Sequence, residues 1–219
     1  MLDLSEQPLA ENLEISARYL TRIAKMNMTL EIELGITGGE EDGVDNSGVA
    51  HDKLYTHPDD VLKAYDTLNP IGSFTVAASF GNTHGVYAPG NVKLKPTILR
   101  DSQRYIREQR KTASAEPVNF VFHGGSGSTP EEIKEAVSYG VVKMNIDTDT
   151  QWAFTHPIKQ FMDEKGAYLK SQLGNPEGPD KPNKKYIDPR GWLAIGEKGM
   201  SARLVEAFKD LGSFQKFDF

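Results

Sequence analysis

Two histidines stand out because each precedes a glycine at or just beyond the end of a strand-like segment. His84 lies within residues 79–85 and His123 within residues 121–125. Neutral imidazole is the usual nitrogen ligand of zinc, and a catalytic zinc site needs three protein ligands and one open position. A hydrogen-bonded structural role fits either histidine alone equally well. The prediction of a metal site therefore depends on the pair.

Carboxylates lie on and after the strand-like segment 28–35. Glu33 points to the inner face of that strand, where an unpaired carboxylate is costly to desolvate. It should therefore have a metal, a proton or a cation such as Lys143 as its partner. Glu41 belongs to an acidic run, 40–42, that follows two glycines. Such a loop could close over a substrate and deliver a general base, and an ordinary acidic surface loop is the alternative.

A glycine- and serine-rich turn, residues 124–129, opens the helix that is predicted to begin near Pro130. Backbone NH groups and small hydroxyls at such a position could hold a phosphate. The turn is not a P-loop, because no Lys-Ser or Lys-Thr pair follows it, and a merely flexible turn is the alternative. Residues 145–149 end the next strand. The two loops match the common phosphate site of parallel barrels, which lies after the last two strands.

Composition narrows the possible chemistry. The chain has 219 residues and no cysteine, so disulfides, thiolate catalysis and cysteine-based zinc sites are excluded. Any metal must be held by His, Asp or Glu. A net charge of -6 without a basic stripe argues against nucleic acid and anionic membranes as partners. No apolar run approaches the roughly 18 residues that cross a bilayer, so we expect a soluble protein that binds small molecules.

Strand-like and helical segments alternate along the chain, which implies parallel strands joined by right-handed crossovers. The predicted strands are 28–35, 74–81, 118–123 and 141–147. The predicted helices are 11–26, 58–68, 96–110, 130–138, a helix from the last strand to about 169, and 189–211. Residues 171–188 are rich in Gly, Pro, Asn and Lys and are predicted to form a loop. This pattern fits a doubly wound sheet or a (β/α)8 barrel.

Side-chain parity favours the barrel. In residues 30–35, Glu31 and Glu33 alternate with three apolar residues, and the same parity recurs in the last two strands. A doubly wound sheet should be apolar on both faces, whereas the inner face of a barrel can turn polar near its mouth. Four βα units and a possible strand remnant at residues 1–4 make about half of eight. We therefore predict an α/β fold in which residues 1–219 form a single partial (β/α)8 TIM-barrel domain that starts mid-barrel.

Four stretches of the sequence resemble the class II fructose-bisphosphate aldolase family, namely residues 30–43, residues 81–87, the glycine loop after His123 and residues 145–150. The resemblance covers nearly the whole chain and places it in the C-terminal part of the barrel. The tail, 174–190, is similar to the longer, dimeric subgroup, so a tagatose-bisphosphate aldolase is a weaker match. The resemblance implies a cytoplasmic lyase of glycolysis and gluconeogenesis that is a homodimer when full length. It would cleave fructose 1,6-bisphosphate reversibly into dihydroxyacetone phosphate and glyceraldehyde 3-phosphate through a zinc-stabilised enediolate.

The resemblance also implies roles for individual residues. His84 and His123 would be ligands of the catalytic zinc, and Asp3 and Glu33 would form an alternative, more buried metal position. Glu41 would be the loop base. The remaining assignments concern the substrate, where Asn145 would help to hold the enediolate and Arg190 would reach the aldehyde-side phosphate, in the partner subunit. A monovalent cation would lie near the ketone-side phosphate, which would be surrounded by Gly85, Gly124, Gly125, Ser126, Ile146, Asp147 and Thr148.

One departure from the family lies at the front of the chain. Family members carry an Asp-His pair at the end of an earlier strand, which supplies the acid/base for the aldehyde oxygen and the third zinc ligand. No Asp-His pair occurs in this sequence. A half barrel has open strand edges and an incomplete core, so we expect the chain alone to be unstable or to need complementation. The alternative function is a truncated, non-catalytic remnant that acts at most as an interaction partner.

Overall fold

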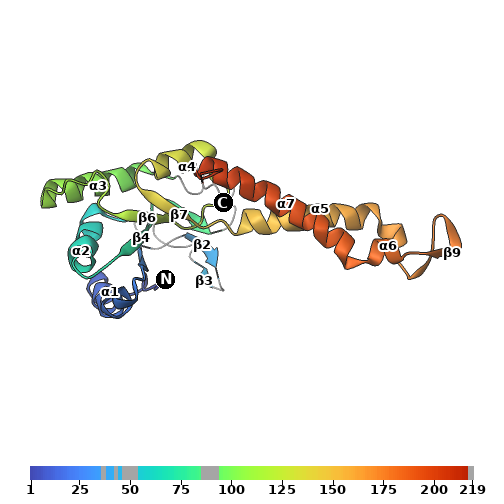
Figure 1. Ribbon diagram of the computed structural model, residues 1–219, viewed down its shortest axis with the longest axis horizontal. Helices are drawn as coiled ribbons and strands as arrows, with labels where there is room; N and C mark the ends of the chain where they lie inside the picture. The colour runs from blue at the N-terminus through green and yellow to red at the C-terminus, as the bar shows by residue number, and fades with distance from the viewer. Residues whose placement is uncertain (36–37, 42–43, 46–53, 85–93, 217–219) are drawn as a thin grey trace. The chain divides into compact units, whose positions relative to one another are not determined.

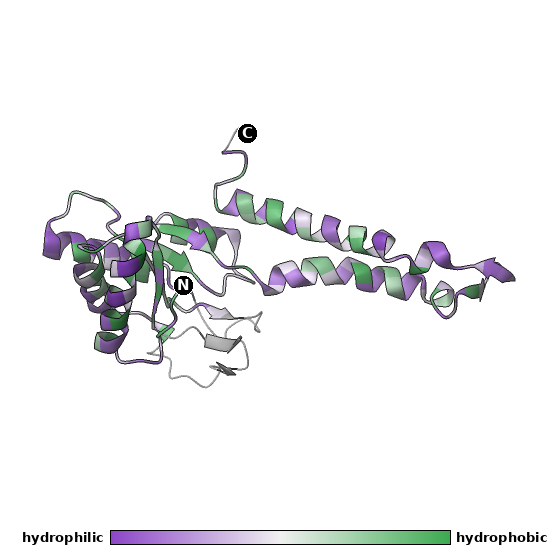
Figure 2. Ribbon diagram, turned by 60° about the horizontal axis from the view of Figure 1, so that its bottom comes forward, coloured by the Kyte–Doolittle hydropathy of each residue, from purple (hydrophilic) through white to green (hydrophobic). Residues whose placement is uncertain are grey.

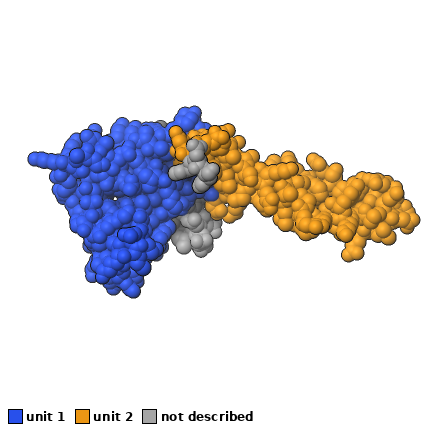
Figure 3. Space-filling view, viewed as in Figure 1, with its two compact units in different colours: residues 1–146 blue, residues 147–219 orange. Residues whose placement is uncertain are grey.

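The computed structural model describes residues 1–35, 38–41, 44–45, 54–84 and 94–216, and for residues 38–41, 44, 45 and 84 it describes the backbone alone. The chain divides into two units, residues Met1–Ile146 and residues Asp147–Phe219 (Figure 3). The expectation that residues 1–219 form a single domain stays a prediction.

Unit 1 is built on a four-stranded parallel sheet (Figure 1). Its strands are β1 (Leu30–Leu34), β4 (Phe74–Ala78), β6 (Asn119–Phe122) and β7 (Val141–Met144). Their order in the sheet is β1-β4-β6-β7, so neighbours along the chain are also neighbours in space. A doubly wound sheet reverses its strand order at a switch point. The sequential order is the one expected for part of a barrel wall.

Helices precede and connect the strands of this sheet. They are α1 (Leu9–Ile23), extended by the 3-10 turn η1 (Ala24–Met26), then α2 (Pro58–Leu68), α3 (Thr97–Arg110) and α4 (Pro130–Val137). α1 packs on β1 and α2, and α2 packs on α3. Thr129 and Glu132 form a capping box at the start of α4. The prediction for α2 is confirmed at both ends, and the other helices differ by a few residues.

The strands bury one apolar face and carry polar groups on the other. Ile32, Val76 and Phe120 are fully buried, and the rings of Phe80 and Phe122 meet edge to face at 4.7 Å between centroids. In Figure 2 the central strands are green, whereas the helices alternate green and purple. The predicted parity is therefore confirmed for β1 and β6.

The last strand departs from that parity. Val142 is 62% exposed, although it was predicted to lie on the apolar face. β7 is the last strand of the sheet in the described part of the chain, and its register with β6 shifts between Phe120 and Val121. An edge strand with a bulge turns side chains that would otherwise be covered towards solvent.

A short second sheet follows the ends of β1 and β4. It contains β2 (Gly38–Glu41), β3 (Val44–Asp45) and β5 (Thr83–His84) in the order β3-β2-β5. β2 runs antiparallel to β3 and parallel to β5. At the amino terminus, the possible strand remnant is a single parallel bridge between Leu2 and Ile32.

Unit 2 consists of two long helices and a hairpin. The helices α5 (Thr148–Glu164) and α7 (Pro189–Asp210) pack along each other. Between them lie the 3-10 turn η3 (Gly166–Tyr168), the strands β8 (Leu173–Asn175) and β9 (Gly178–Pro182), and the short helix α6 (Lys184–Ile187). None of the helices in the described ranges is long and apolar enough to cross a membrane.

The prediction of a loop at residues 171–188 was wrong, because β8 and β9 pair as an antiparallel hairpin. The residues that suggested a loop provide the turn. Asn175 accepts a hydrogen bond from the backbone NH of Glu177, and Gly174 has a φ of +86°. Asn183 is fully buried and donates to the carbonyls of Ser171 and Gly174.

Glycines on α7 allow it to approach α5 closely. A Cβ atom at Gly199 would lie 2.2 Å from the carbonyl oxygen of Ala153 and 3.0 Å from Pro157 Cγ. A Cβ at Gly196 would lie 2.8 Å from Ile158 Cδ1. Real Cβ atoms do not approach so closely, so the helix pair depends on these two positions having no side chain.

Candidate metal and substrate site

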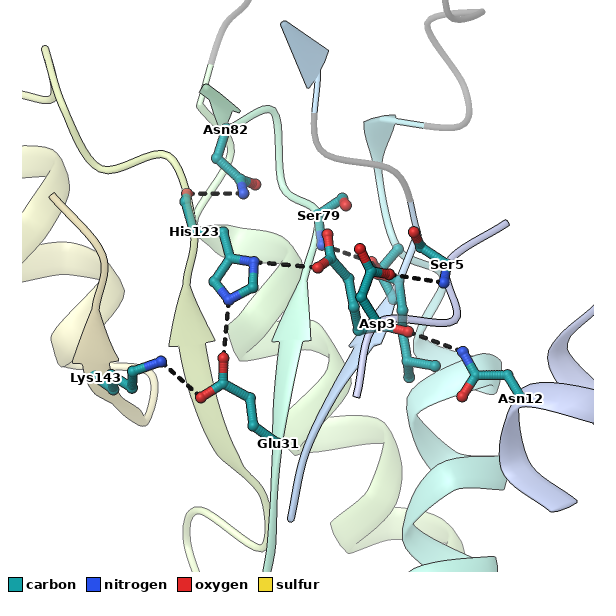
Figure 4. A network of polar contacts seen from close by, with 11 residues as sticks. Asp3, Ser5, Asn12, Glu31, Ser79, Asn82, His123 and Lys143 are labelled. Atoms are coloured by element: carbon teal, nitrogen blue, oxygen red, sulfur yellow. Dashed lines mark hydrogen bonds and ion pairs between the residues drawn. The ribbon is translucent and has the colours of Figure 1, made fainter. Parts of the chain in front are cut away.

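His123 follows β6 directly and lies between two carboxylates from β1 (Figure 4). Its Nδ1 is 3.2 Å from Glu33 Oε2, and its Nε2 is 2.9 Å from Glu31 Oε1. The Nζ of Lys143, on β7, is 2.7 Å from the other oxygen of Glu31. The side chains of His123 and Glu33 are only 4% and 6% exposed. Together Glu33, His123, Glu31 and Lys143 form what we call the carboxylate–histidine chain.

The register of the sheet explains how side chains from β1 and β6 meet across β4. Glu33 is paired with Ala77, and Ala77 is paired with Val121, two residues before His123. Ala77 therefore shares the inner face with Glu33, and its side chain is a single methyl group. We infer that this small side chain leaves room for the imidazole to cross β4, whereas a larger one would fill the space.

Two buried asparagines hold the backbone at this site. Asn82 donates from Nδ2 to the carbonyl of His123 at 2.9 Å and accepts from the NH of Phe80 at 2.8 Å. Asn12 donates to the carbonyl of Glu33 at 3.0 Å. Such supporting hydrogen bonds fix the orientation of side chains that act as ligands.

Burial and hydrogen bonding act in opposite directions on the pKa values of His123 and Glu31. Burial lowers the pKa of His123, but its hydrogen bonds to Glu33 and Glu31 outweigh this effect and raise the pKa above its ordinary 6.5. Burial raises the pKa of Glu31, but Lys143 and His123 outweigh it, so that this pKa lies below its ordinary 4.5. A metal ion that binds His123 must therefore compete with a proton.

The structure decides one alternative that the sequence left open and adds one residue to the site. Lys143 was considered as the cation that pairs with Glu33, but in the described residues it pairs with Glu31, because the imidazole of His123 already contacts Glu33. Glu31 itself was not among the predicted site residues. Its signal was present in the sequence, since it shares the inner-face parity of Glu33.

The structure says less about the other two candidate metal ligands, Asp3 and His84. Asp3 is exposed, and its Oδ1 accepts from the NH of Ser5 at 2.9 Å (Figure 4). The backbone of His84 ends β5, and its side chain lies outside the described residues. Among the side chains that are described, no three His, Asp or Glu groups form a cluster that could hold a metal ion.

The donors that are in place nevertheless fit a divalent metal such as zinc. His123 supplies an imidazole nitrogen and Glu33 a carboxylate, both buried and in contact, and these are ligand types that zinc binds. The side chain of Asn82 is hydrogen-bonded to the backbone of His123, and His84 lies two residues after Asn82. His84 is therefore the residue from which a second imidazole donor would come.

The predicted loop base, Glu41, lies on β2. The structure pairs Gly39 of this strand with His84 of β5. Glu41 lies on the same strand, two residues after Gly39. The side chain of Glu41 lies outside the described residues, and its role stays a prediction.

The two predicted phosphate loops are joined by a hydrogen bond. The NH of Gly125 donates to the carbonyl of Asn145 at 2.9 Å, so this NH is already used within the protein. A Cβ at Gly125 would lie 2.7 Å from Met144 Cε, so the close approach of the loops needs a glycine here. Gly124 adopts a φ of +60°, and Ser126 is buried. Gly85 lies outside the described residues, and phosphate binding by Gly124, Gly125, Ser126 and Ile146 stays a prediction.

The remaining predicted substrate residues belong to unit 2. Both carboxylate oxygens of Asp147 accept from Gln151 Nε2 at 2.9 Å, and Thr148 is the first residue of α5. Arg190 has a side chain that is 86% exposed and contacts Asp188, the N-cap of α7. Hydrogen bonds from the Arg190 side chain and backbone NH lower the pKa of Asp188 to about 2.

The chain is similar to several known proteins. The family described as "Fructose-bisphosphate aldolase class-II" matches residues 1–216. The fructose-bisphosphate aldolase of Haemophilus influenzae is 62% identical over 212 residues, which are 96% of this chain and 59% of the relative. The class 2 enzyme of Escherichia coli K12 is 60% identical over 97% of this chain and 59% of its own length.

A solved structure is similar as well. The crystal structure of fructose-bisphosphate aldolase from Campylobacter jejuni has a TM-score of 0.85 and 55% identity, and the match covers 99% of this chain and 61% of that chain. The fold prediction, part of a (β/α)8 barrel, is thereby confirmed. The chain spans about three fifths of the length of these relatives.

Proposed function

Because this chain belongs to the class II fructose-bisphosphate aldolase family, we propose that it takes part in the reversible cleavage of fructose 1,6-bisphosphate, a step of glycolysis and gluconeogenesis. The products are dihydroxyacetone phosphate and glyceraldehyde 3-phosphate. The observation that supports this best is the buried contact between His123 and Glu33. It lies at the carboxyl ends of parallel strands, where barrel enzymes keep their active sites.

A divalent metal ion, zinc by its donor types, would be held by His123 and His84, with Glu33 and Asp3 as an alternative position. When bound, the metal supplies a Lewis acid that polarises the ketone of the substrate. Asp3 currently accepts a hydrogen bond from Ser5, so it would have to exchange that contact to serve as a ligand. A monovalent cation near the ketone-side phosphate belongs to the same proposal.

Two residues would act on the carbon skeleton. Cleavage leaves negative charge on the carbon beside the ketone, and a carboxylic acid must return a proton there. We assign this task to Glu41, because its strand runs beside His84. The side-chain amide of Asn145 would donate a hydrogen bond to an oxygen of the reacting fragment, and the bond from Gly125 to its carbonyl fixes its backbone.

The phosphates would be bound by loops and by unit 2. We assign the ketone-side phosphate to the loops that carry Gly85, Gly124, Ser126 and Ile146, with Gly125 acting through the close approach that it allows. We assign Asp147 and Thr148 to the same phosphate because they directly follow Ile146 in the sequence, and the amino terminus of the 17-residue helix α5 suits an anion. Arg190 would bind the aldehyde-side phosphate of a partner subunit after it exchanges Asp188 for phosphate oxygens.

We further propose that the full-length protein is a cytoplasmic homodimer. Large apolar side chains are exposed on unit 2, including Trp152, Leu173, Leu193 and Phe208. Exposed apolar side chains of this kind are what a protein–protein contact can cover, which supports the proposal.

The test is an assay of fructose 1,6-bisphosphate cleavage. The 219-residue chain would be compared with the same chain joined to the portion of the Campylobacter jejuni relative that the match does not cover. We expect the joined protein to be active, EDTA to abolish the activity and zinc to restore it. Glu41→Gln should lower kcat by about 100-fold or more without releasing zinc. The exposed Glu108→Gln is the control with the same change in charge. A folded, zinc-loaded joined protein without turnover would contradict the proposal.

A further inference from the structure

We propose that Glu31 is a positioning residue which, together with Lys143, decides which nitrogen of His123 faces the metal. Nε2 keeps its proton and donates it to Glu31, and Nδ1 is left for the metal on the side of Glu33. This inference rests on the proposed function, since it requires a metal site at His123.

The first step of the argument concerns protons. Ionised carboxylates can only accept hydrogen bonds, and His123 has one carboxylate at each ring nitrogen, at 2.9 Å and 3.2 Å. The neutral imidazole that binds a metal carries one N–H. Only one of the two contacts can therefore keep its proton when a metal binds, and the surroundings decide which.

The second step compares the two carboxylates. The contact of His123 with Glu31 is the shorter one, and the other oxygen of Glu31 is held by Lys143 at 2.7 Å. A carboxylate beside a cation stays ionised and remains a strong acceptor. Nε2 is therefore the nitrogen that retains its proton.

The third step uses position along the strand. Glu33 lies two residues nearer than Glu31 to the carboxyl end of β1, which is roughly 6.6 Å at the usual rise of a strand. The segment that contains Asn82 and His84 lies at that end, because Asn82 is bonded to the backbone of His123. Nδ1, on the Glu33 side, thus faces the strand ends from which a substrate can approach.

A carboxylate behind a metal-binding histidine has two known effects. It fixes the ring orientation, and it makes the ligating nitrogen more basic. Removal of such a partner typically weakens metal binding by about 10- to 100-fold. Lys143 extends the arrangement by one residue. It donates a hydrogen bond to the carboxylate of Glu31, and this carboxylate contacts the imidazole of His123.

The experiment measures the zinc affinity of the full 219-residue chain by competition with a chromophoric chelator. Glu31→Gln should weaken zinc binding by about 10- to 100-fold, and Lys143→Met should weaken it by less, because Glu31 remains. Lys143→Arg keeps the cation and should bind zinc as the wild type does. Glu108→Gln controls for the loss of one negative charge on the surface.

A second readout reports the tautomer directly. In zinc-free protein at a pH where His123 is neutral, the ¹⁵N shifts of its ring nitrogens should show a proton on Nε2 in the wild type and a mixture of tautomers in Glu31→Gln. A residue that only stabilised the fold would not move this signal. The side chain of Lys143 is 49% exposed on the last strand of the described sheet, so Lys143→Met tests the inference even where Glu31→Gln does not fold.

The outcomes separate the two proposals. Wild-type protein that binds zinc, with variants that match its affinity and its tautomer, would overturn the role of Glu31 and leave the proposed function standing. A wild-type chain that is folded but binds no zinc would overturn the inference, whereas the proposed function would be overturned only by a folded joined protein that binds no zinc. Weaker zinc binding together with a shifted tautomer supports the inference.

Discussion

The two units of this protein contain ion pairs of similar length in opposite surroundings. In unit 1 the contact between His123 and Glu31 measures 2.9 Å, and the side chains are 4% and 12% exposed. In unit 2 the contact between Arg190 and Asp188 measures 2.5 Å, and the arginine is 86% exposed. Exposed pairs contribute little to stability, whereas a buried charge that loses its partner is costly. Burial, and not distance, therefore decides how much each of these two contacts contributes to stability.

Breaking the buried pairs should have the largest effect. His123→Ala would leave Glu31 and Glu33 without their imidazole partner, so we expect the free energy of unfolding of unit 1 to fall by about 3–5 kcal/mol. Urea unfolding followed by far-UV circular dichroism measures this loss. His156→Ala, in unit 2, is the matched control, because this imidazole stacks on the exposed Trp152. A loss of less than about 1 kcal/mol for His123→Ala would contradict the comparison.

Unit 2 should instead respond to changes in helix packing. Gly199→Ala places a methyl group against the carbonyl of Ala153, so we expect a loss of about 1–3 kcal/mol from overpacking. Gly191→Ala on the same helix is the control, since nothing lies within 4 Å of its Cβ position, and it should be neutral or slightly stabilising. Both tryptophans of the chain, Trp152 and Trp192, belong to unit 2, so their fluorescence during urea unfolding reports this effect. Equal stability of the two variants would show that the helices can move apart freely.

The stability of the metal-free protein should depend on pH through the buried chain. The folded state raises the pKa of His123, so its contribution is full below 6.5 and is lost as the pH rises through the folded value. The folded state lowers the pKa of Glu31, so that contribution is present above 4.5 and is lost as the pH falls through the folded value. Glu33 and Lys143 are the other two members of the carboxylate–histidine chain. Urea midpoints measured across this range should therefore fall on the alkaline side in the wild type.

The variant His123→Gln sharpens that prediction. It lacks the titrating imidazole, so its urea midpoint should not show the alkaline fall. A fall of the same size in both proteins would assign the pH dependence to other groups.

The smallest effect is expected at the exposed pair. Asp188→Asn removes the charge that faces Arg190 but keeps a side chain that caps helices well. We expect the melting temperature to stay the same within error. A clear decrease would mean that this surface pair matters as much as the buried one, and the contrast between the units would be lost.

Local features of the fold could be predicted from the sequence. The bounds of α2, the capping box of Thr129 and Glu132, and the inner-face parity of Glu31 and Glu33 all depend on residues close together in the chain. The parity was also enough to favour a barrel over a doubly wound sheet.

Contacts between distant strands could not be predicted in this way. The partner of Lys143 depends on the register of β7 with β6 and on the imidazole that already contacts Glu33. Whether His123 can reach β1 depends on Ala77, a residue of an intervening strand with no chemistry of its own. The hairpin of β8 and β9 was missed for a different reason, because glycine, proline and asparagine serve tight turns and loops alike.

The carboxylate–histidine chain also has a consequence for the order of folding. It joins Glu31 to residues that lie 92 and 112 positions later, His123 and Lys143. Contacts of such long range form only after the loops between them have closed, and the intervening helices can form earlier. We therefore expect these contacts to be absent from the folding transition state, so that His123→Ala accelerates unfolding and hardly slows refolding. The residues that would bind the metal would then be the last of the sheet to come together and the first to separate.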